Sequence, residues 1–200
     1  MEAERAGGEV TEKMRQILVD WLVDVHESFG LKEETLQLGI LYLDEYQRRE
    51  TIVRDDYQLV GVTCLWVASK YEEIYPPNIK KYVEVTARTY SSAQIKHMEG
   101  EILKSLNFNL TKVSPLALLN AHSHQLSPNA PSHQLSPKAL LLAKYLLELT
   151  LFQGSILGKY GLRVTVGAAV FLTDSILSLG GKSGLEVWEG VGGEVESCSK

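Results

Sequence analysis

The chain has 200 residues, of which 44% are hydrophobic, and its formal net charge is −5. This composition is typical of a globular protein with a sizeable core. The acidic balance excludes nucleic acid as the main partner, because phosphate binding needs a basic face. No uninterrupted apolar run reaches the length that crosses a bilayer, so neither a membrane span nor a membrane partner is predicted.

The N-terminus and the cysteines indicate a reducing compartment. The first ten residues, MEAERAGGEV, are acidic and polar, unlike a secretory signal peptide. Cys64 lies in an apolar run and Cys198 in a polar tail. A disulfide framework is therefore not expected.

The hydrophobic pattern divides the chain into helix-length segments. In chain order, the predicted helices are 14–29, 34–47, 56–74, 77–85, 92–106, 114–122, 136–152 and 161–179. Almost no stretch alternates with the two-residue period of a strand. The predicted fold class is therefore all-α.

Cap residues mark several of the predicted helix ends. Ser91 or Ser92 can cap the fifth helix. Pro77 can open the fourth helix, since proline is tolerated in a first turn. Ser114 and Ser136 each precede a proline, the pattern of an N-cap followed by proline at the first helical position.

The first predicted helix has more apolar surface than one face can bury. Its apolar arc consists of Met14, Ile17, Leu18, Trp21 and Val25, with Asp24 at the edge, and Val19, Leu22, Val23 and Phe29 extend it. A surface helix needs a stripe of only roughly 100° to cover a core. Two interpretations stay open. The helix is central and buried by its neighbours, or part of the arc remains as a groove for a partner peptide.

Two polar residues fall inside the apolar part of this helix. A buried guanidinium such as that of Arg15 is costly unless it is paired. Asp44 lies on the apolar arc of the second predicted helix, so we expect a structural ion pair between Arg15 and Asp44. His26 is interpreted as a core histidine with satisfied hydrogen bonds.

The third predicted helix, YQLVGVTCLWVASKY, is apolar on nearly every side. Such a helix belongs at the centre of a bundle. Gly61, Cys64, Ala68 and Ser69 are small, so neighbouring helices can approach closely. We therefore predict a five-helix bundle around this central helix.

The middle and the end of the chain are rich in turn formers. The stretch SHQLSP occurs at 123–128 and again at 132–137. His122, His124 and His133 have no neighbouring cysteine or carboxylate, so neither a metal site nor a cofactor is predicted. The glycine-rich tail over 180–200 is predicted to be poorly ordered.

Four stretches carry a family resemblance: MRQILVDWLVDV, LQLGILYLDEY, YQLVGVTCLWVASKYEEIYPP and MEGEILKSLNFNL. Together they resemble the first cyclin box of an A- or B-type (mitotic) cyclin. LLLAKYLLELTLF and VTVGAAVFL are similar to the second and third helices of the second cyclin box. The resemblance implies a lead-in over 1–13, a first cyclin box over 14–110, a truncated second box over 111–179 and the tail over 180–200.

The resemblance implies a cyclin-dependent protein kinase as partner. In the family, the lysine of the ASKYEEIYPP motif and the glutamate of the ME motif contact the regulatory helix of the kinase. They correspond here to Lys70 and Glu99. The expected neighbours on the same surface are Tyr71, Glu72, Ile74 and Tyr75.

The family also has a docking patch for Arg-x-Leu motifs of substrates and inhibitors. The matching residues are Met14, Ile17, Leu18, Trp21 and Gln58. Asp24 stands where a glutamate is usual, which shortens the reach to the basic residue of a ligand. A second departure is Asp44–Glu45–Tyr46 in place of the usual DRF, which changes a surface charge.

The resulting hypothesis is a regulatory subunit that activates a cyclin-dependent serine/threonine kinase in mitosis, in the nucleus and the cytoplasm. The chain itself is not predicted to be an enzyme, because it has no nucleophile–base set and no phosphate-binding loop. One alternative is a transcription-type cyclin-box adaptor, which would need a basic face. Another is an inert truncated fragment, which the short second box favours.

Overall fold

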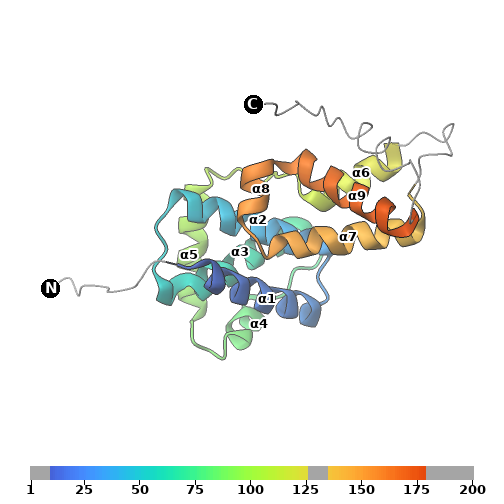
Figure 1. Cartoon of the computed structure of the whole chain (residues 1–200). Coiled ribbons are helices and arrows are strands. Elements are labelled where there is room, and N and C mark those ends of the chain that lie inside the picture. Colours follow the sequence, from blue (N-terminus) through green and yellow to red (C-terminus); the bar gives the residue numbers. More distant parts are fainter. Residues whose placement is uncertain (1–9, 126–134, 179–200) are drawn as a thin grey trace, which may run out of the picture. The chain divides into compact units, whose positions relative to one another are not determined.

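The computed structural model of the chain describes residues 10–125 and 135–178, and these residues form α-helices joined by short connections (Figure 1). The chain divides into two compact units, Met1–Lys112 and Val113–Lys200. Residues 1–9 of the lead-in, most of the repeated SHQLSP loop with His133, and the tail with Cys198 lie outside the described residues.

The elements of the first unit are α1 (Glu12–Phe29), α2 (Glu33–Arg49), the 3-10 turn η1 (Arg54–Asp56), α3 (Tyr57–Glu72), α4 (Ile79–Val85) and α5 (Ser92–Ser105). Thr11 caps α1, since its hydroxyl accepts a hydrogen bond from the amide of Met14 at 3.3 Å. The helix ends at Gly30, whose φ of 62° allows the left-handed turn that satisfies the last carbonyls.

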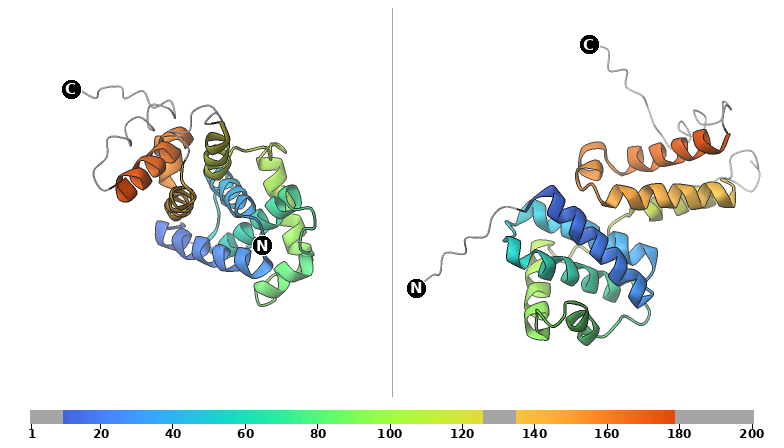
Figure 2. Two further views of the ribbon diagram at one scale, coloured as in Figure 1. Left: turned by 90° about the vertical axis from the view of Figure 1, so that its right-hand side faces the viewer. Right: turned by 60° about the horizontal axis from the view of Figure 1, so that its bottom comes forward.

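The helix α3 is the centre of this unit. It contacts α1, α2, α4 and α5, and every residue from Leu59 to Ser69 is buried. Two glycines make this close packing possible. A Cβ on Gly61 would lie 2.8 Å from Leu18 of α1, and one on Gly39 of α2 would lie 3.2 Å from the Cα of Leu65. Figure 2 shows the surrounding helices from two further sides.

Most helix ends differ from the sequence prediction by one to three residues, and two of these differences have a clear structural cause. The third helix was predicted to reach residue 74 but stops at Glu72, because Glu73 adopts an extended backbone. The predicted start of α4 at Pro77 was also wrong. Asn78 is the N-cap instead, and its side chain accepts a hydrogen bond from the amide of Lys80 at 3.0 Å.

The elements of the second unit are α6 (Pro115–Gln125), α7 (Pro137–Leu151), α8 (Ser155–Tyr160) and α9 (Leu162–Ser178). The predicted caps are present. Ser114 accepts from the amide of Ala117 at 2.9 Å, and Ser136 accepts from the amide of Ala139 at 3.2 Å. The short helix α8 was not predicted. The core consists of Leu119, Ala143, Leu147, Val166, Ala169 and Val170.

Among the described helices, none combines the length and the apolar composition needed to cross a membrane.

Candidate functional site

The C-terminal end of α3 presents a cation next to an aromatic ring. The ammonium of Lys70 lies 3.7 Å from the ring centroid of Trp66, a cation–π contact. It also forms an ion pair with the carboxylate of Glu99 on α5. The family resemblance implied that these two residues share one surface, and the structure brings their side chains into direct contact.

The loop after α3 exposes large apolar side chains. Ile74 is 80% and Tyr75 91% exposed. The loop is anchored by Glu73, whose carboxylate accepts hydrogen bonds from the hydroxyl of Thr35 at 2.6 Å and the amide of Lys32 at 2.8 Å. The two hydrogen bonds of Glu73 fix the backbone next to Ile74 and Tyr75. The side chains of Ile74 and Tyr75 therefore stay exposed to solvent.

The segment after α5 adds a residue that the sequence analysis missed. Phe108 is 69% exposed and has a φ of 55°. Its segment is tied to α3 by the hydrogen bond between the hydroxyls of Tyr71 and Thr111 at 3.0 Å. A signal was available: Phe108 is an aromatic residue between two asparagines, directly after the end of a helix.

These side chains form one candidate site, which we call the α3–α5 surface. It consists of Lys70, Tyr71, Glu72, Ile74, Tyr75, Glu99 and Phe108. Glu72 is held at its edge by Lys32, whose ammonium lies 3.4 Å from the Glu72 carboxylate and donates to the Glu72 carbonyl at 2.8 Å. A half-buried ion pair flanked by exposed apolar side chains is typical of a protein-binding surface.

A second candidate surface, the α1 patch, consists of Met14, Ile17, Leu18, Trp21, Asp24 and Gln58. Ile17 is 62% exposed, and Asp24 is exposed as well. Leu18 is buried against Gly61 and belongs to the core. Gln58 lies three residues before Gly61, and residues three apart share a helix face, so it lies on the side of α3 that meets α1.

The apolar side chains of α1 therefore divide into a buried set and a set that is at least partly exposed. Val19, Leu22 and Val25 are buried in the bundle, whereas Ile17 faces solvent and Met14 and Trp21 are half-buried. Burial by neighbouring helices, the first interpretation, holds for part of the arc, and the groove for a partner peptide stays a prediction.

The ion pair between Arg15 and Asp44 joins α1 to α2. Two guanidinium nitrogens of Arg15 donate to the carboxylate at 2.8–3.0 Å, and the Arg15 side chain is buried. Burial raises the pKa of Asp44 above its ordinary value, and the guanidinium opposes that rise without cancelling it. The prediction for His26 was wrong, because neither ring nitrogen has a hydrogen-bond partner among the described residues.

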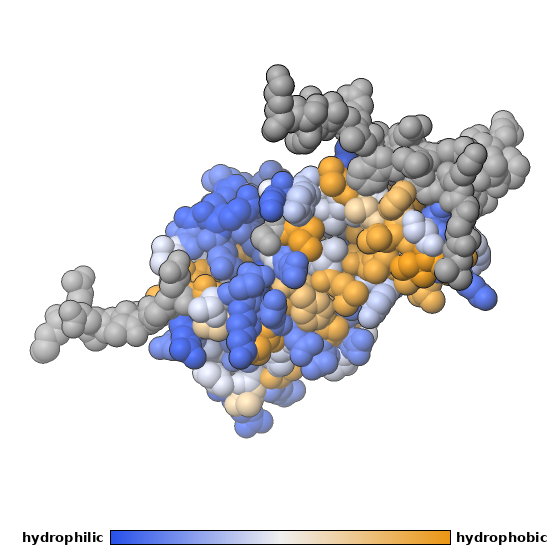
Figure 3. All heavy atoms as spheres, in the orientation of Figure 1, coloured by the Kyte–Doolittle hydropathy of each residue, from blue (hydrophilic) through white to orange (hydrophobic). Residues whose placement is uncertain are grey.

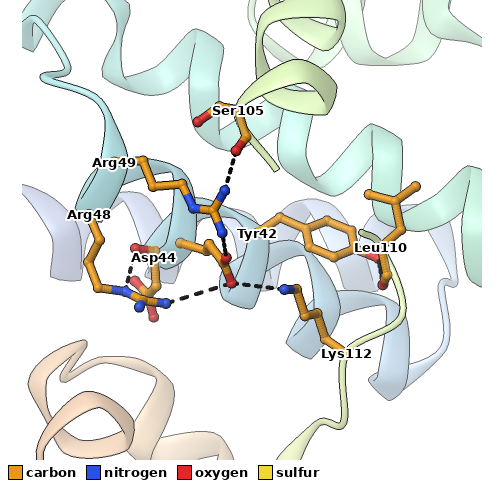
Figure 4. Close-up of polar contacts among 8 residues, drawn as sticks. Tyr42, Asp44, Arg48, Arg49, Ser105, Leu110 and Lys112 are labelled. Atoms are coloured by element: carbon orange, nitrogen blue, oxygen red, sulfur yellow. Dashed lines mark hydrogen bonds and ion pairs between the residues drawn. The ribbon is translucent and has the colours of Figure 1, made fainter. Parts of the chain in front are cut away.

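The C-terminal end of α2 carries a cluster of charges around Glu45, and Figure 4 labels its partners Arg48, Arg49 and Lys112. The Glu45 carboxylate pairs with Arg49 and with Lys112, the latter at 3.0 Å, and Arg48 lies 3.8 Å away. Arg49 also donates to the carbonyl of Ser105. Glu45 therefore holds the segment that follows α5.

Two groups set the electrostatics and the path of this segment. Burial alone would raise the pKa of Glu45, but the ion pairs with Lys112 and Arg49 outweigh it, so the pKa lies below its ordinary value. The hydroxyl of Tyr42 donates to the carbonyl of Leu110 at 2.7 Å. Both contacts fix the chain just after Phe108.

Within residues 10–125 and 135–178, no group of three or more histidine, cysteine or acidic side chains is arranged to hold a metal ion. Cys64 is a buried free thiol, and burial raises its pKa well above the ordinary value.

Comparison with known proteins gives consistent matches. Residues 3–111 match the family model described as "Cyclin, N-terminal domain". The chain is 42% identical over 169 residues to a G2/mitotic-specific cyclin-B of Marthasterias glacialis, with 84% of this chain and 42% of that protein covered. It is 49% identical over 123 residues to a G2/mitotic-specific cyclin-B1 of Caenorhabditis elegans, with 62% and 34% covered. The chain thus spans less than half the length of these relatives.

Among solved structures, the X-ray structure of a viral cyclin from herpesvirus saimiri superimposes with a TM-score of 0.78. The match covers 94% of this chain and 80% of the other, at 20% sequence identity. At this identity the likeness concerns the fold alone.

Proposed function

The chain belongs to the cyclin family, and on this premise we propose that it is a regulatory subunit that binds a cyclin-dependent serine/threonine protein kinase and raises its activity in mitosis. The family and the all-α cyclin-box fold predicted from the sequence are confirmed by the matches. In the proposed role the chain controls phosphoryl transfer and leaves the chemistry to the kinase.

The observation that carries the proposal is the α3–α5 surface. It combines an ion pair, Lys70–Glu99, with the exposed apolar residues Ile74, Tyr75 and Phe108. A single ion pair at the protein surface typically contributes only about 0–1 kcal/mol, so the half-buried Lys70–Glu99 pair is not expected to supply the affinity alone. The apolar side chains supply contact area, and their backbone is already fixed by hydrogen bonds, so little conformational entropy is lost on binding.

The proposed mechanism is stabilisation of one kinase conformation. A protein kinase is active when its own lysine–glutamate ion pair is assembled, and the position of its regulatory helix controls that pair. A partner shifts this equilibrium only by its difference in affinity for the two conformations. The ordered α3–α5 surface would bind the active position of the helix and leave the inactive one unbound.

Reversing both charges, Lys70→Glu with Glu99→Lys, tests the proposal. The two residues contact each other, so the double variant keeps an ion pair within the chain while it inverts the charges offered to the kinase. We expect kinase binding to weaken by at least about tenfold. Binding is measured by calorimetry and helicity by circular dichroism, with unchanged helicity expected.

The matched control is Glu101→Lys with Lys104→Glu. Glu101 and Lys104 form an exposed ion pair at 3.5 Å on α5, the helix that also carries Glu99. The control should bind and activate the kinase like the unmodified chain. Equal affinity of the Lys70/Glu99 variant would contradict the assignment of the contact. A chain that activates no cyclin-dependent kinase at all would contradict the function.

We further propose that the α1 patch binds Arg-x-Leu motifs of substrates or inhibitors. The exposed apolar side chain of Ile17 would meet the leucine, and the carboxylate of Asp24 would meet the arginine. The support is the excess apolar surface of α1 together with the family motif, which Met14, Trp21 and Gln58 complete.

The test for the α1 patch replaces Ile17, since this side chain is exposed and its loss leaves the core intact. Ile17→Asp should reduce phosphorylation of an Arg-x-Leu substrate by about tenfold, as expected for losing one buried apolar side chain at an interface. Trp21→Ala should act in the same direction. Phosphorylation of a short peptide without the motif should not change. Gln16→Asp, at the exposed position next to Ile17, is the control variant and should leave phosphorylation of both substrates unchanged. Equal loss on both substrates would refute specific docking.

A further inference from the structure

The helix α7 is apolar on two opposite sides. Its inner side is buried, with Ala139, Ala143, Leu147 and Leu151 in the core of the second unit. Its outer side carries Leu141, which is 70% exposed, and the exposed side chains of Tyr145 and Leu149. Figure 3 shows hydrophobic surface over α7 and α9. A helix that is apolar all round is normally covered on all sides.

The outer side of α7 has charges at defined places. Leu141, Tyr145 and Leu149 are four residues apart and therefore lie in one row along the helix. At about 100° per residue, Lys138 and Glu148 fall on the same side as this row. The row thus begins beside a cation and ends beside an anion, over about 15 Å of helix.

This arrangement is complementary to itself. Suppose that a second α7 lies antiparallel across the first, with a two-fold axis at the level of Ala143. Lys138 lies five residues before Ala143 and Glu148 five residues after it, so each lysine faces the glutamate of the other copy. Leu141 lies two residues before Ala143 and Tyr145 two residues after it, so Leu141 of each copy faces Tyr145 of the other. A two-fold interface needs such self-complementarity.

We infer that the outer side of α7 is a self-association surface, on which a second copy of this chain binds antiparallel. The apolar row supplies the buried area, and the two Lys138–Glu148 pairs set the register and the direction. The inference uses only the second unit and is independent of the kinase-binding proposal.

Charge exchange between copies tests the inference on the full chain. Self-association is measured by sedimentation velocity from low-micromolar to high-micromolar concentration. Lys138→Glu places two acidic side chains opposite each other at both ends of the interface, and Glu148→Lys places two basic ones there. Each single variant should associate at least about tenfold more weakly than the unmodified chain.

An equimolar mixture of the two single variants should associate like the unmodified chain, because each mixed pair again faces opposite charges. Leu141→Glu should abolish association without loss of helicity, since the residue is largely exposed. Lys96→Glu, on an exposed part of α5, is the control and should associate normally.

Three results would overturn the inference. The first is a chain that stays monomeric throughout the concentration range, as expected if another segment of the same chain or a different protein covers α7. The second is association that Leu141→Glu or the single charge variants leave unchanged. The third is weak association of both single variants that mixing does not restore.

Discussion

The central helix α3 of the first unit and α7 of the second are both rich in apolar residues but differ in their surroundings. Both are apolar on nearly every side. α3 has α1, α2, α4 and α5 around it, and all residues from Leu59 to Ser69 are buried. α7 packs mainly against α9 and α6, so its inner side is buried while Leu141, Tyr145 and Leu149 stay exposed.

The difference shows that an apolar sequence pattern predicts that a helix is buried, but does not identify the segment or partner that buries it. In the first unit, small residues such as Gly61 let neighbouring helices approach α3 closely enough to bury it. In the second unit, the described helices cover only one side of α7. The uncovered side of α7 is the reason to expect that the second unit binds a partner there, whereas α3 is buried by helices of its own unit.

The largest expected effect concerns the ion pair between Arg15 and Asp44, which joins α1 to α2 in the first unit. Arg15→Ala leaves the partly buried carboxylate of Asp44 without its buried guanidinium partner and should lower the free energy of unfolding by about 3–5 kcal/mol. Urea denaturation followed by tryptophan fluorescence measures this loss, since Trp21 and Trp66 both lie in the first unit. Adding Asp44→Ala should recover part of the loss, because no unpaired charge then remains.

The effect of Arg15→Ala should also depend on pH. Burial raises the pKa of Asp44 in the folded state, and removing Arg15 removes the group that opposes this rise. A raised carboxyl pKa means that the folded state binds the proton more tightly than the unfolded state. The deficit of the variant should therefore shrink as the pH falls through the raised pKa. A deficit that stays constant down to acid pH would contradict the pairing.

The next effect compares the two apolar helices directly. Leu65→Ala in α3 removes a fully buried side chain and should lower the free energy of unfolding by about 2–5 kcal/mol. Leu141→Ala removes an exposed one, and the change should stay within about 0.5 kcal/mol at dilute, monomeric concentration. Chemical denaturation of both variants gives the values. Similar losses would show that α7 is covered on its outer side within a single chain.

The sequence predicted the helices of the first unit well, because each has a strong local signal. Ser91 caps α5 through a capping box with Gln94, and the uniformly apolar α3 could only lie at the centre. The end of α3 and the start of α4 were predicted less well. Glu73 leaves the helix to reach Thr35 on α2, a long-range contact that no local pattern contains.

The candidate site was predicted in part, for a similar reason. Lys70, Ile74 and Tyr75 belong to one continuous motif, and Glu99 to a second. Phe108 was missed because its place depends on a left-handed backbone and on the contact between Tyr71 and Thr111. That Lys70 and Glu99 contact each other also followed only from the packing of α3 against α5.

The smallest expected effect concerns the end of the first unit, where Glu45 holds Lys112. The ion pairs keep the pKa of Glu45 below its ordinary value, so its contribution to stability is present above the pKa of the unfolded state and is lost as the pH falls through the folded pKa. Glu45→Gln should cost less than about 1 kcal/mol at neutral pH, because the cluster is near the surface.

The difference in unfolding free energy between Glu45→Gln and the unmodified chain should therefore vanish towards acid pH, where both side chains are neutral. Glu101→Gln, in the exposed pair with Lys104, is the control and should change stability less at every pH. If Glu45→Gln were as stable as the unmodified chain at neutral pH, the contact with Lys112 would contribute nothing. The path of the chain after Phe108 would then depend on the hydrogen bonds of Tyr42 and Tyr71 alone.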